Sequence, residues 1–185
     1  DLAKLGMKVG LHGCVGGDLF GRALGEMMSA AGVDCRGLVT VPDCPTAGTF
    51  VINVQGEDRR FIHCIGANAA FDGTQVTDAD LQNTRVLAVG GDCLLEALTP
   101  DRVIALFQRA RQAGVTTLLD VVLGSRDNYW DWIAPVMPWT DAFMPNDHEA
   151  ARITGLTTPR DQAKKLRGAG CRNVIITCGG DGVLL

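Results

Sequence analysis

The sequence predicts an α/β protein built on a mostly parallel β-sheet. Short apolar runs alternate along the chain with segments whose apolar residues recur at helical spacing. Most of these runs are apolar throughout, which is typical of strands that helices cover on both faces. One pair of segments instead alternates between polar and apolar residues, and this pattern predicts an antiparallel hairpin.

Strands and helices are expected in turn from the amino-terminal side. A strand is expected over residues 8–12 and a helix over residues 18–31, where apolar side chains recur every three or four positions. The next strand is expected over residues 85–89. A helix over residues 99–112 follows it, with Pro100 suited to the first helical turn.

The same alternation continues through the rest of the chain. Three further strands are expected, over residues 115–120, 141–144 and 174–177. Two further helices are expected, one starting at Asn146 and one over residues 159–168.

The hairpin is expected over residues 48–65, with its tip at residues 55–58. An antiparallel hairpin has no place within a parallel sheet, so it needs another location. Open α/β sheets bind ligands beyond the carboxyl ends of their strands. We therefore expect a β-hairpin lid at residues 48–65, over an α/β core made of residues 1–47 and 66–185.

Composition narrows the classes of function. Of the 185 residues, 46% are hydrophobic and 21% are charged, which is typical of a globular domain. The formal net charge of −4 argues against a nucleic-acid partner, because such partners favour a basic face. No apolar run is long enough to predict a membrane span. The seven cysteines form no C-x-x-C pair, and this usage fits a reducing, cytoplasmic setting.

Three segments at strand ends could carry chemistry, and each has a structural alternative. Residues 13–21 are rich in glycine, and Asp18 within them is suited to cap a helix. Asn146 and Glu149 have the spacing of a capping box, although a carboxylate there could also hold a hydrated Mg²⁺ against phosphate. Thr177 and the glycines after it could approach a phosphate or form an ordinary hairpin turn.

Two acidic residues follow strands as well. Asp92 and Asp120 could each meet a substrate hydroxyl, or could be ordinary loop or capping residues. The three histidines lie far apart and lack metal-ligand spacing, so we expect them to be structural or surface residues.

Taken together and in this order, the segments closely resemble the ribokinase-like carbohydrate kinases of the PfkB family. Residues 13–21 are similar to the first signature loop of that family, and residues 45–49 and 66–70 to the two ends of its lid hairpin. Pro145-Asn146-Asp147-His148-Glu149 matches its Asn-x-x-Glu element, and residues 174–182 resemble the strand and turn that lead to its nucleotide site. The resemblance implies a ribokinase-like three-layer sandwich with a mostly parallel sheet and a small β-hairpin lid.

The resemblance also implies a reaction, cofactors and partners. The reaction is ATP-dependent transfer of phosphate to a hydroxymethyl group of a sugar, as in ribokinases, fructokinases and ketodeoxygluconate kinases, or of a nucleoside. ATP and Mg²⁺ are the implied cofactors, and a monovalent cation is a further candidate. The implied partner is a small molecule, with neither nucleic acid nor membrane.

Individual positions take roles from the same resemblance. Glu149 and Asn146 would organise Mg²⁺, while Asn146, Thr177, Gly179 and Gly182 would line the nucleotide and its phosphates. The candidates for substrate binding are the residues of one lid face together with the two strand-end acids, namely Thr49, Val51, Asn53, Asp92 and Asp120. The opposite, apolar lid face would pack or form a homodimer through the lid of a second subunit.

The second signature of the family, a Gly-Ala-Gly-Asp run with the general base, does not occur within these residues. We expect that run beyond Leu185, and the opening strand with a sugar-binding Asp before Asp1. The sequence ends within an expected hairpin, where domains seldom finish. We therefore expect the middle of a larger enzyme, with no catalytic residue in this chain and no activity of the chain alone. The alternative is a non-catalytic protein that binds a ligand or partner on the same scaffold.

Overall fold

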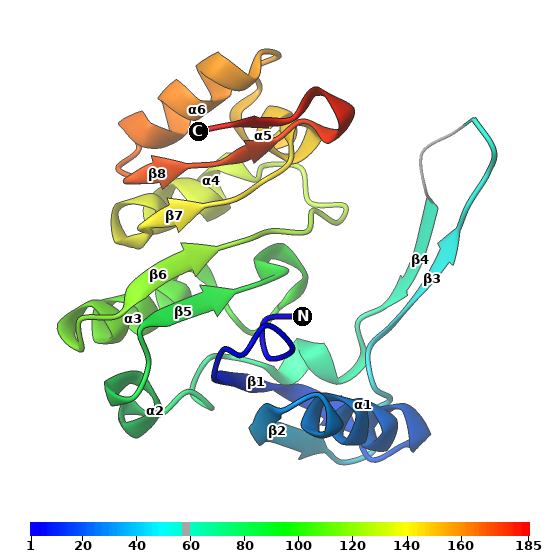
Figure 1. Cartoon of the computed structure of the whole chain (residues 1–185). Helices are drawn as coiled ribbons and strands as arrows, with labels where there is room; N and C mark the ends of the chain where they lie inside the picture. The colour runs from blue at the N-terminus through cyan, green and yellow to red at the C-terminus, as the bar shows by residue number, and fades with distance from the viewer. Residues whose placement is uncertain (57–59) are drawn as a thin grey trace. The chain divides into compact units, whose positions relative to one another are not determined.

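The computed structural model describes residues 1–56 and 60–185 (Figure 1). Its internal contacts divide the chain into two compact units. Unit 1 comprises Asp1–Gln75 and Leu95–Ala97, and unit 2 comprises Val76–Leu94 and Leu98–Leu185. The division into an α/β core and a lid stays a prediction.

Unit 1 is built on two parallel strands joined by a helix. β1 (Val9–Gly16) pairs in parallel with β2 (Val33–Val41), and α1 (Leu19–Ala30) connects them. β1 is longer than expected, because the strand continues through the first half of the glycine-rich segment. Asp18 caps α1 as predicted, since its Oδ1 accepts a hydrogen bond of 2.8 Å from the backbone N–H of Gly21.

The predicted hairpin is present in unit 1 (Figure 1). β3 (Gly48–Ile52) pairs antiparallel with β4 (Arg60–Cys64), and every residue of both strands is exposed. A short 3₁₀ helix, η1 (Gly66–Ala70), follows β4. Of the predicted tip, residues 57 and 58 lie outside the described residues.

Unit 2 contains a four-stranded sheet in which all neighbours are parallel, as the apolar runs predict. Its strands lie in the order β5 (Val86–Val89), β6 (Thr116–Leu119), β7 (Ala142–Phe143) and β8 (Asn173–Val174). The α-helices of the unit are α2 (Asp78–Gln82), α3 (Pro100–Gln112), α4 (Trp130–Ile133), α5 (Asp147–Thr154) and α6 (Pro159–Gly168). Three 3₁₀ helices are η2 (Asp92–Leu94), η3 (Ala134–Trp139) and η4 (Gly179–Asp181).

The strand expected over residues 174–177 is divided in the structure between β8 and β9 (Ile176–Thr177), and β9 pairs antiparallel with β10 (Val183–Leu184) in the expected hairpin. α3 buries one face, which carries Val103, Leu106, Phe107 and Ala110. The strands bury Leu119, Phe143 and Ile176 completely. Burial of each such large side chain stabilises the fold by roughly 1.5–3 kcal/mol, so these side chains stabilise the sheet that carries the candidate site.

Among the described residues, no helix combines the length and the apolar character that crossing a membrane requires.

Candidate nucleotide and metal site

The candidate residues of unit 2 gather at the carboxyl edge of its sheet. Asn146 forms an isolated parallel bridge with Thr177, and the backbone N–H of Thr177 donates to Pro145 O at 3.1 Å. On the neighbouring strands, the backbone N–H of Asp92 donates to Asp120 O at 3.3 Å. Residues that are distant in sequence thus end up side by side, at the edge where α/β sheets bind ligands.

Asn146 and Glu149 form the capping box that their spacing predicts. Asn146 Oδ1 accepts from the backbone N–H of Glu149 at 2.8 Å, and Glu149 Oε2 accepts from the backbone N–H of Asn146 at 2.9 Å. Each oxygen that accepts one hydrogen bond keeps a second lone pair. The capping role therefore leaves room for a ligand, and the metal-binding role of both residues stays a prediction.

Two carboxylates at this edge have raised pKa values. Burial raises the pKa of Glu149, and the charge of Asp120 raises it further, against the Asn146 N–H and Arg152, which lower it. Burial also raises the pKa of Asp120, which is an exposed residue. A carboxylate whose ionisation is disfavoured by burial and by a second acid is a favourable place for a divalent cation.

The donor set at this edge suits a hydrated ion better than a fully protein-bound one. Within residues 1–56 and 60–185, no group of three His, Cys, Asp or Glu side chains is arranged to hold a metal. Mg²⁺ usually keeps several waters and takes one or two carboxylates together with substrate phosphates. Asp120 and Glu149 fit that description.

The glycine turn between β9 and β10 also belongs to this unit. Gly179 and Gly182 have φ angles of +56° and +95°, in the region where glycine is favoured. The backbone N–H of Cys178 donates to Gly182 O at 2.8 Å and closes the turn. A Cβ added at either glycine would meet no atom within 4 Å, so the backbone there is open to an approaching ligand. Phosphate binding at this turn stays a prediction.

Asp92 differs from the other candidates because it points into the protein. It is completely buried, and its Oδ2 accepts a hydrogen bond of 3.0 Å from Trp132 Nε1. Arg126 stacks over the same indole, 3.9 Å from the ring centroid. The burial of the Asp92 side chain therefore does not support its predicted contact with a substrate. The sequence predictions did not include Trp132 or Arg126. The one local signal for them is that aromatic and basic residues cluster after the strand over residues 115–120.

The predicted lid residues lie in unit 1. Thr49 pairs across the hairpin with His63, and its Oγ1 lies 2.7 Å from His63 Nδ1. Val51 pairs with Phe61 on the same face. Asn53 was predicted on the same strand face, but it lies beyond the end of β3 and outside the paired residues.

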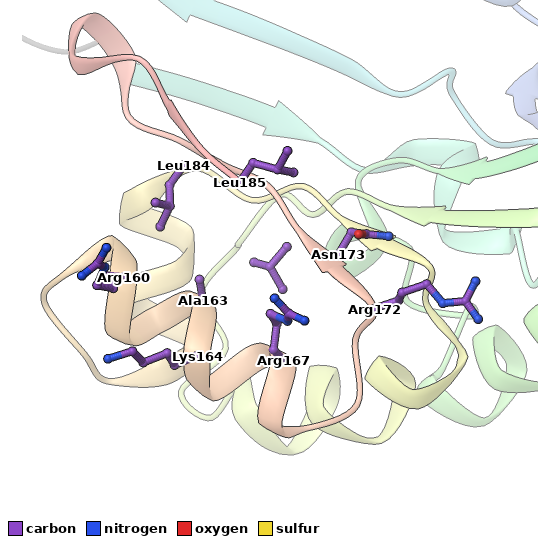
Figure 2. Close-up of a pocket in the computed structure, with 9 residues that line it drawn as sticks. Arg160, Ala163, Lys164, Arg167, Arg172, Asn173, Leu184 and Leu185 are labelled. Atoms are coloured by element: carbon purple, nitrogen blue, oxygen red, sulfur yellow. The ribbon is translucent and has the colours of Figure 1, made fainter.

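A separate hollow of about 450 Å³ lies beside α6 (Figure 2). Figure 2 shows Arg160, Lys164 and Arg167 on the helix, with Arg172 and the last two leucines around them. None of the candidate site residues lines this hollow. It is therefore distinct from the carboxyl-edge site.

Comparison with known proteins supports the same assignment. The family model described as pfkB family carbohydrate kinase matches residues 2–185. The chain belongs to this family. Among solved structures, the PfkB protein from Polaromonas sp. JS666 is 27% identical, with a TM-score of 0.83 over 98% of this chain and 64% of that one.

Two further relatives show how much of a related protein the chain represents. The ribokinase of Haemophilus influenzae is 26% identical over 99% of this chain and 59% of its own length. A putative ribokinase II from E. coli, solved in complex with ATP and Mg²⁺, is 25% identical, with a TM-score of 0.81 over 98% of this chain and 60% of that one. The chain thus spans about three fifths of the relatives that it matches.

Proposed function

We propose that the complete protein is an ATP- and Mg²⁺-dependent kinase that phosphorylates a hydroxymethyl group of a sugar or nucleoside. The observation that carries the proposal is the bridge between Asn146 and Thr177, within a chain of the PfkB family. That bridge unites the Asn-x-x-Glu element with the strand that leads to the glycine turn. A relative of the same family was solved with ATP and Mg²⁺, which agrees with the cofactors proposed.

Mg²⁺ bound at this edge would neutralise phosphate charge and orient the transferred group. Glu149 would hold waters of the hydrated ion, with Asp120 nearby, and Asn146 would fix the orientation of Glu149 through the capping box. The hydroxyl of Thr177 would donate to a phosphate oxygen, and the open backbone of Gly179 and Gly182 would lie against the nucleotide.

The lid would supply the substrate face. The side of the hairpin with Thr49, Val51 and their partners His63 and Phe61 carries both hydrogen-bonding and apolar groups, which suits a sugar. Closure of this face would exclude water, so that phosphate passes to the sugar and not to solvent. The opposite face carries Phe50 and Ile62, which are 70% and 64% exposed and would form the contact of a homodimer.

The substrate class stays open between sugars and nucleosides. The relatives include the ribokinase already described and the aminoimidazole riboside kinase of Salmonella typhimurium. The second is 28% identical over 100% of this chain and 59% of its own length. A monovalent cation and a cytoplasmic location remain predictions.

The test is release of ADP by the complete protein with ATP, in the presence and absence of Mg²⁺, against a panel of ribose, fructose, ketodeoxygluconate and nucleosides. We expect Mg²⁺-dependent turnover with at least one of them. Binding of a sugar or nucleoside with no turnover on any member of the panel would favour the non-catalytic alternative.

A further inference from the structure

The base of the lid is bound by the carboxylate of Asp18, which also caps α1. The backbone N–H of Thr46 donates to Asp18 Oδ2 at 2.8 Å, and the Thr46 hydroxyl donates to Asp18 Oδ1 at 2.6 Å. The same hydroxyl oxygen accepts from the backbone N–H of Gly16 at 2.9 Å. Asp18 therefore joins the start of α1 to the segment that enters the lid, and the Thr46 hydroxyl extends this connection to the end of β1.

The segment that leaves the lid is fastened to the segment that enters it. The backbone N–H of Ala67 donates to Pro45 O at 2.8 Å, and Ala67 is completely buried. A Cβ added to Gly66 would lie under 3.0 Å from Pro45 O, and one added to Gly16 would lie under 3.0 Å from Cys44 O. The backbones at the lid base thus touch directly, and both ends of the hairpin are held at one point.

The electrostatics of the base agree with this geometry. The pKa of Asp18 is lowered to about 2, first by the side-chain hydrogen bond from Thr46 and then by the backbone N–H groups of Thr46 and Gly21. The carboxylate is ionised at every pH at which the protein would work. Its hydrogen bonds are accordingly charge-assisted and stronger than neutral ones.

Beyond this base, the hairpin has few restraints of its own. All residues of β3 and β4 are exposed, and the two strands pair with each other. A two-stranded hairpin is marginally stable by itself, so its direction depends on how its base is held.

We propose that Asp18 is a positioning residue for the lid, and that through Thr46 it fixes the direction in which the hairpin projects from the rest of unit 1. Bending of the lid then takes place beyond Thr46, and the face that carries Thr49 and Val51 is presented in one orientation. For the sugar this inference rests on the proposed function, whereas the anchoring itself does not depend on it.

Two substitutions test the anchor, each with a matched control. Thr46→Val removes the hydroxyl at constant shape, and Thr46→Ser restores it. Asp18→Asn removes the charge, and Asp34→Asn is its control, because Asp34 is another acid of unit 1 whose pKa is lowered to about 2, mainly by Arg36 and away from the lid base.

The first readout is hydrogen–deuterium exchange of peptides that cover the lid base and the two lid strands. Thr46→Val and Asp18→Asn should raise exchange there by about tenfold, because local opening follows the loss of hydrogen bonds to a charged group. Thr46→Ser and Asp34→Asn should leave it near the wild-type rate. Unchanged exchange in both Thr46→Val and Asp18→Asn would overturn the anchor.

The second readout is the steady-state kinetics of the complete protein. Both disruptive variants should raise the KM for the sugar by about tenfold and leave the KM for ATP unchanged, since the lid supplies only the sugar face. Faster exchange of the lid peptides in the two variants, together with a wild-type protein that phosphorylates no sugar, would retain the anchor and reject the proposed function. An active enzyme with unchanged exchange and unchanged sugar KM would reject the anchor alone.

Discussion

The indole Nε1 of Trp132 donates a hydrogen bond to Asp92 Oδ2 across 3.0 Å, while the Oδ1 of the same carboxyl group is buried without a hydrogen-bond partner among the described residues. Burial raises the pKa of Asp92 to about 6, against Trp132, Cys93 and Arg126, which lower it. The folded protein therefore favours the neutral acid at this position.

We expect the stability of unit 2 to depend on the protonation of Asp92. The folded pKa of about 6 lies above the ordinary 3.8, so stability is fully present below pH of about 4 and is lost as pH rises towards 6. The loss amounts to about 3 kcal/mol and levels off at higher pH. Denaturant unfolding followed by tryptophan fluorescence reports on this unit, because all three tryptophans lie within it.

Asp92→Asn isolates this effect, since an amide imitates the neutral acid and can still accept from Trp132. The variant should lose the decline of stability between about pH 4 and 6, whereas Asp127→Asn, at an exposed loop position, should keep it. An equal decline in both variants would mean that other groups cause the pH dependence.

Two glycines of α1 should respond in opposite directions to substitution by alanine. A Cβ at Gly21 would lie under 3.0 Å from Gly16 O and from Thr46 Oγ1, whereas a Cβ at Gly25 would meet no atom within 4 Å. Gly21→Ala should destabilise unit 1 by about 2 kcal/mol or more through overpacking. Gly25→Ala should stabilise it by about 0.5–1 kcal/mol through helix propensity. Thermal unfolding followed by circular dichroism measures both, and equal effects would contradict the close contact at Gly21.

Much of the fold could be predicted because local signals agreed with tertiary packing. α6 begins and ends at the predicted residues, while α3 begins one residue after its predicted start, at Pro100, and ends at the predicted residue; a threonine at the N-cap position precedes each helix. β2 was missed because Asp34, Arg36 and Gly37 interrupt its apolar pattern. In the structure Arg36 pairs with Asp34, and Gly37 lies close against the ring of His12 on β1, so this strand depends on contacts that sequence periodicity does not reveal.

The candidate site could be predicted in part for a similar reason. Asn146 and Thr177 were each predicted at the end of a strand, and the structure has them side by side at the carboxyl edge of the sheet. The inward direction of Asp92 could not be predicted, because it depends on Trp132, which lies on a different element of the fold. The Asp18–Thr46 contact also joins distant segments, and no local motif predicts it.

Deletion of residues 55–58 at the lid tip should weaken sugar binding or dimerisation while sparing ATP binding. The paired register of the hairpin starts at Ile52 and Arg60, so the deletion leaves the strands themselves in place. We expect the KM for the sugar to rise about tenfold, equivalent to about 1.4 kcal/mol, or the dimer to dissociate at correspondingly higher concentration. Kinetics and sedimentation measure the two effects, and a change confined to the KM for ATP would refute the assignment of this hairpin as a lid.

Glu149→Gln should separate the capping role of Glu149 from its proposed metal role in the complete protein. A glutamine keeps an oxygen that can accept from the Asn146 N–H, so α5 and the fold should remain intact. The lost charge should raise the Mg²⁺ concentration needed for half-maximal turnover and lower turnover by about tenfold or more, because the metal loses a carboxylate beside its waters. Asp147→Asn is the matched control, since Asp147 carries the same charge in the same helical turn and its Oδ1 accepts from the backbone N–H of His148 at 3.0 Å, outside the capping box. Unchanged kinetics of Glu149→Gln across Mg²⁺ concentrations would leave Glu149 with the capping role alone.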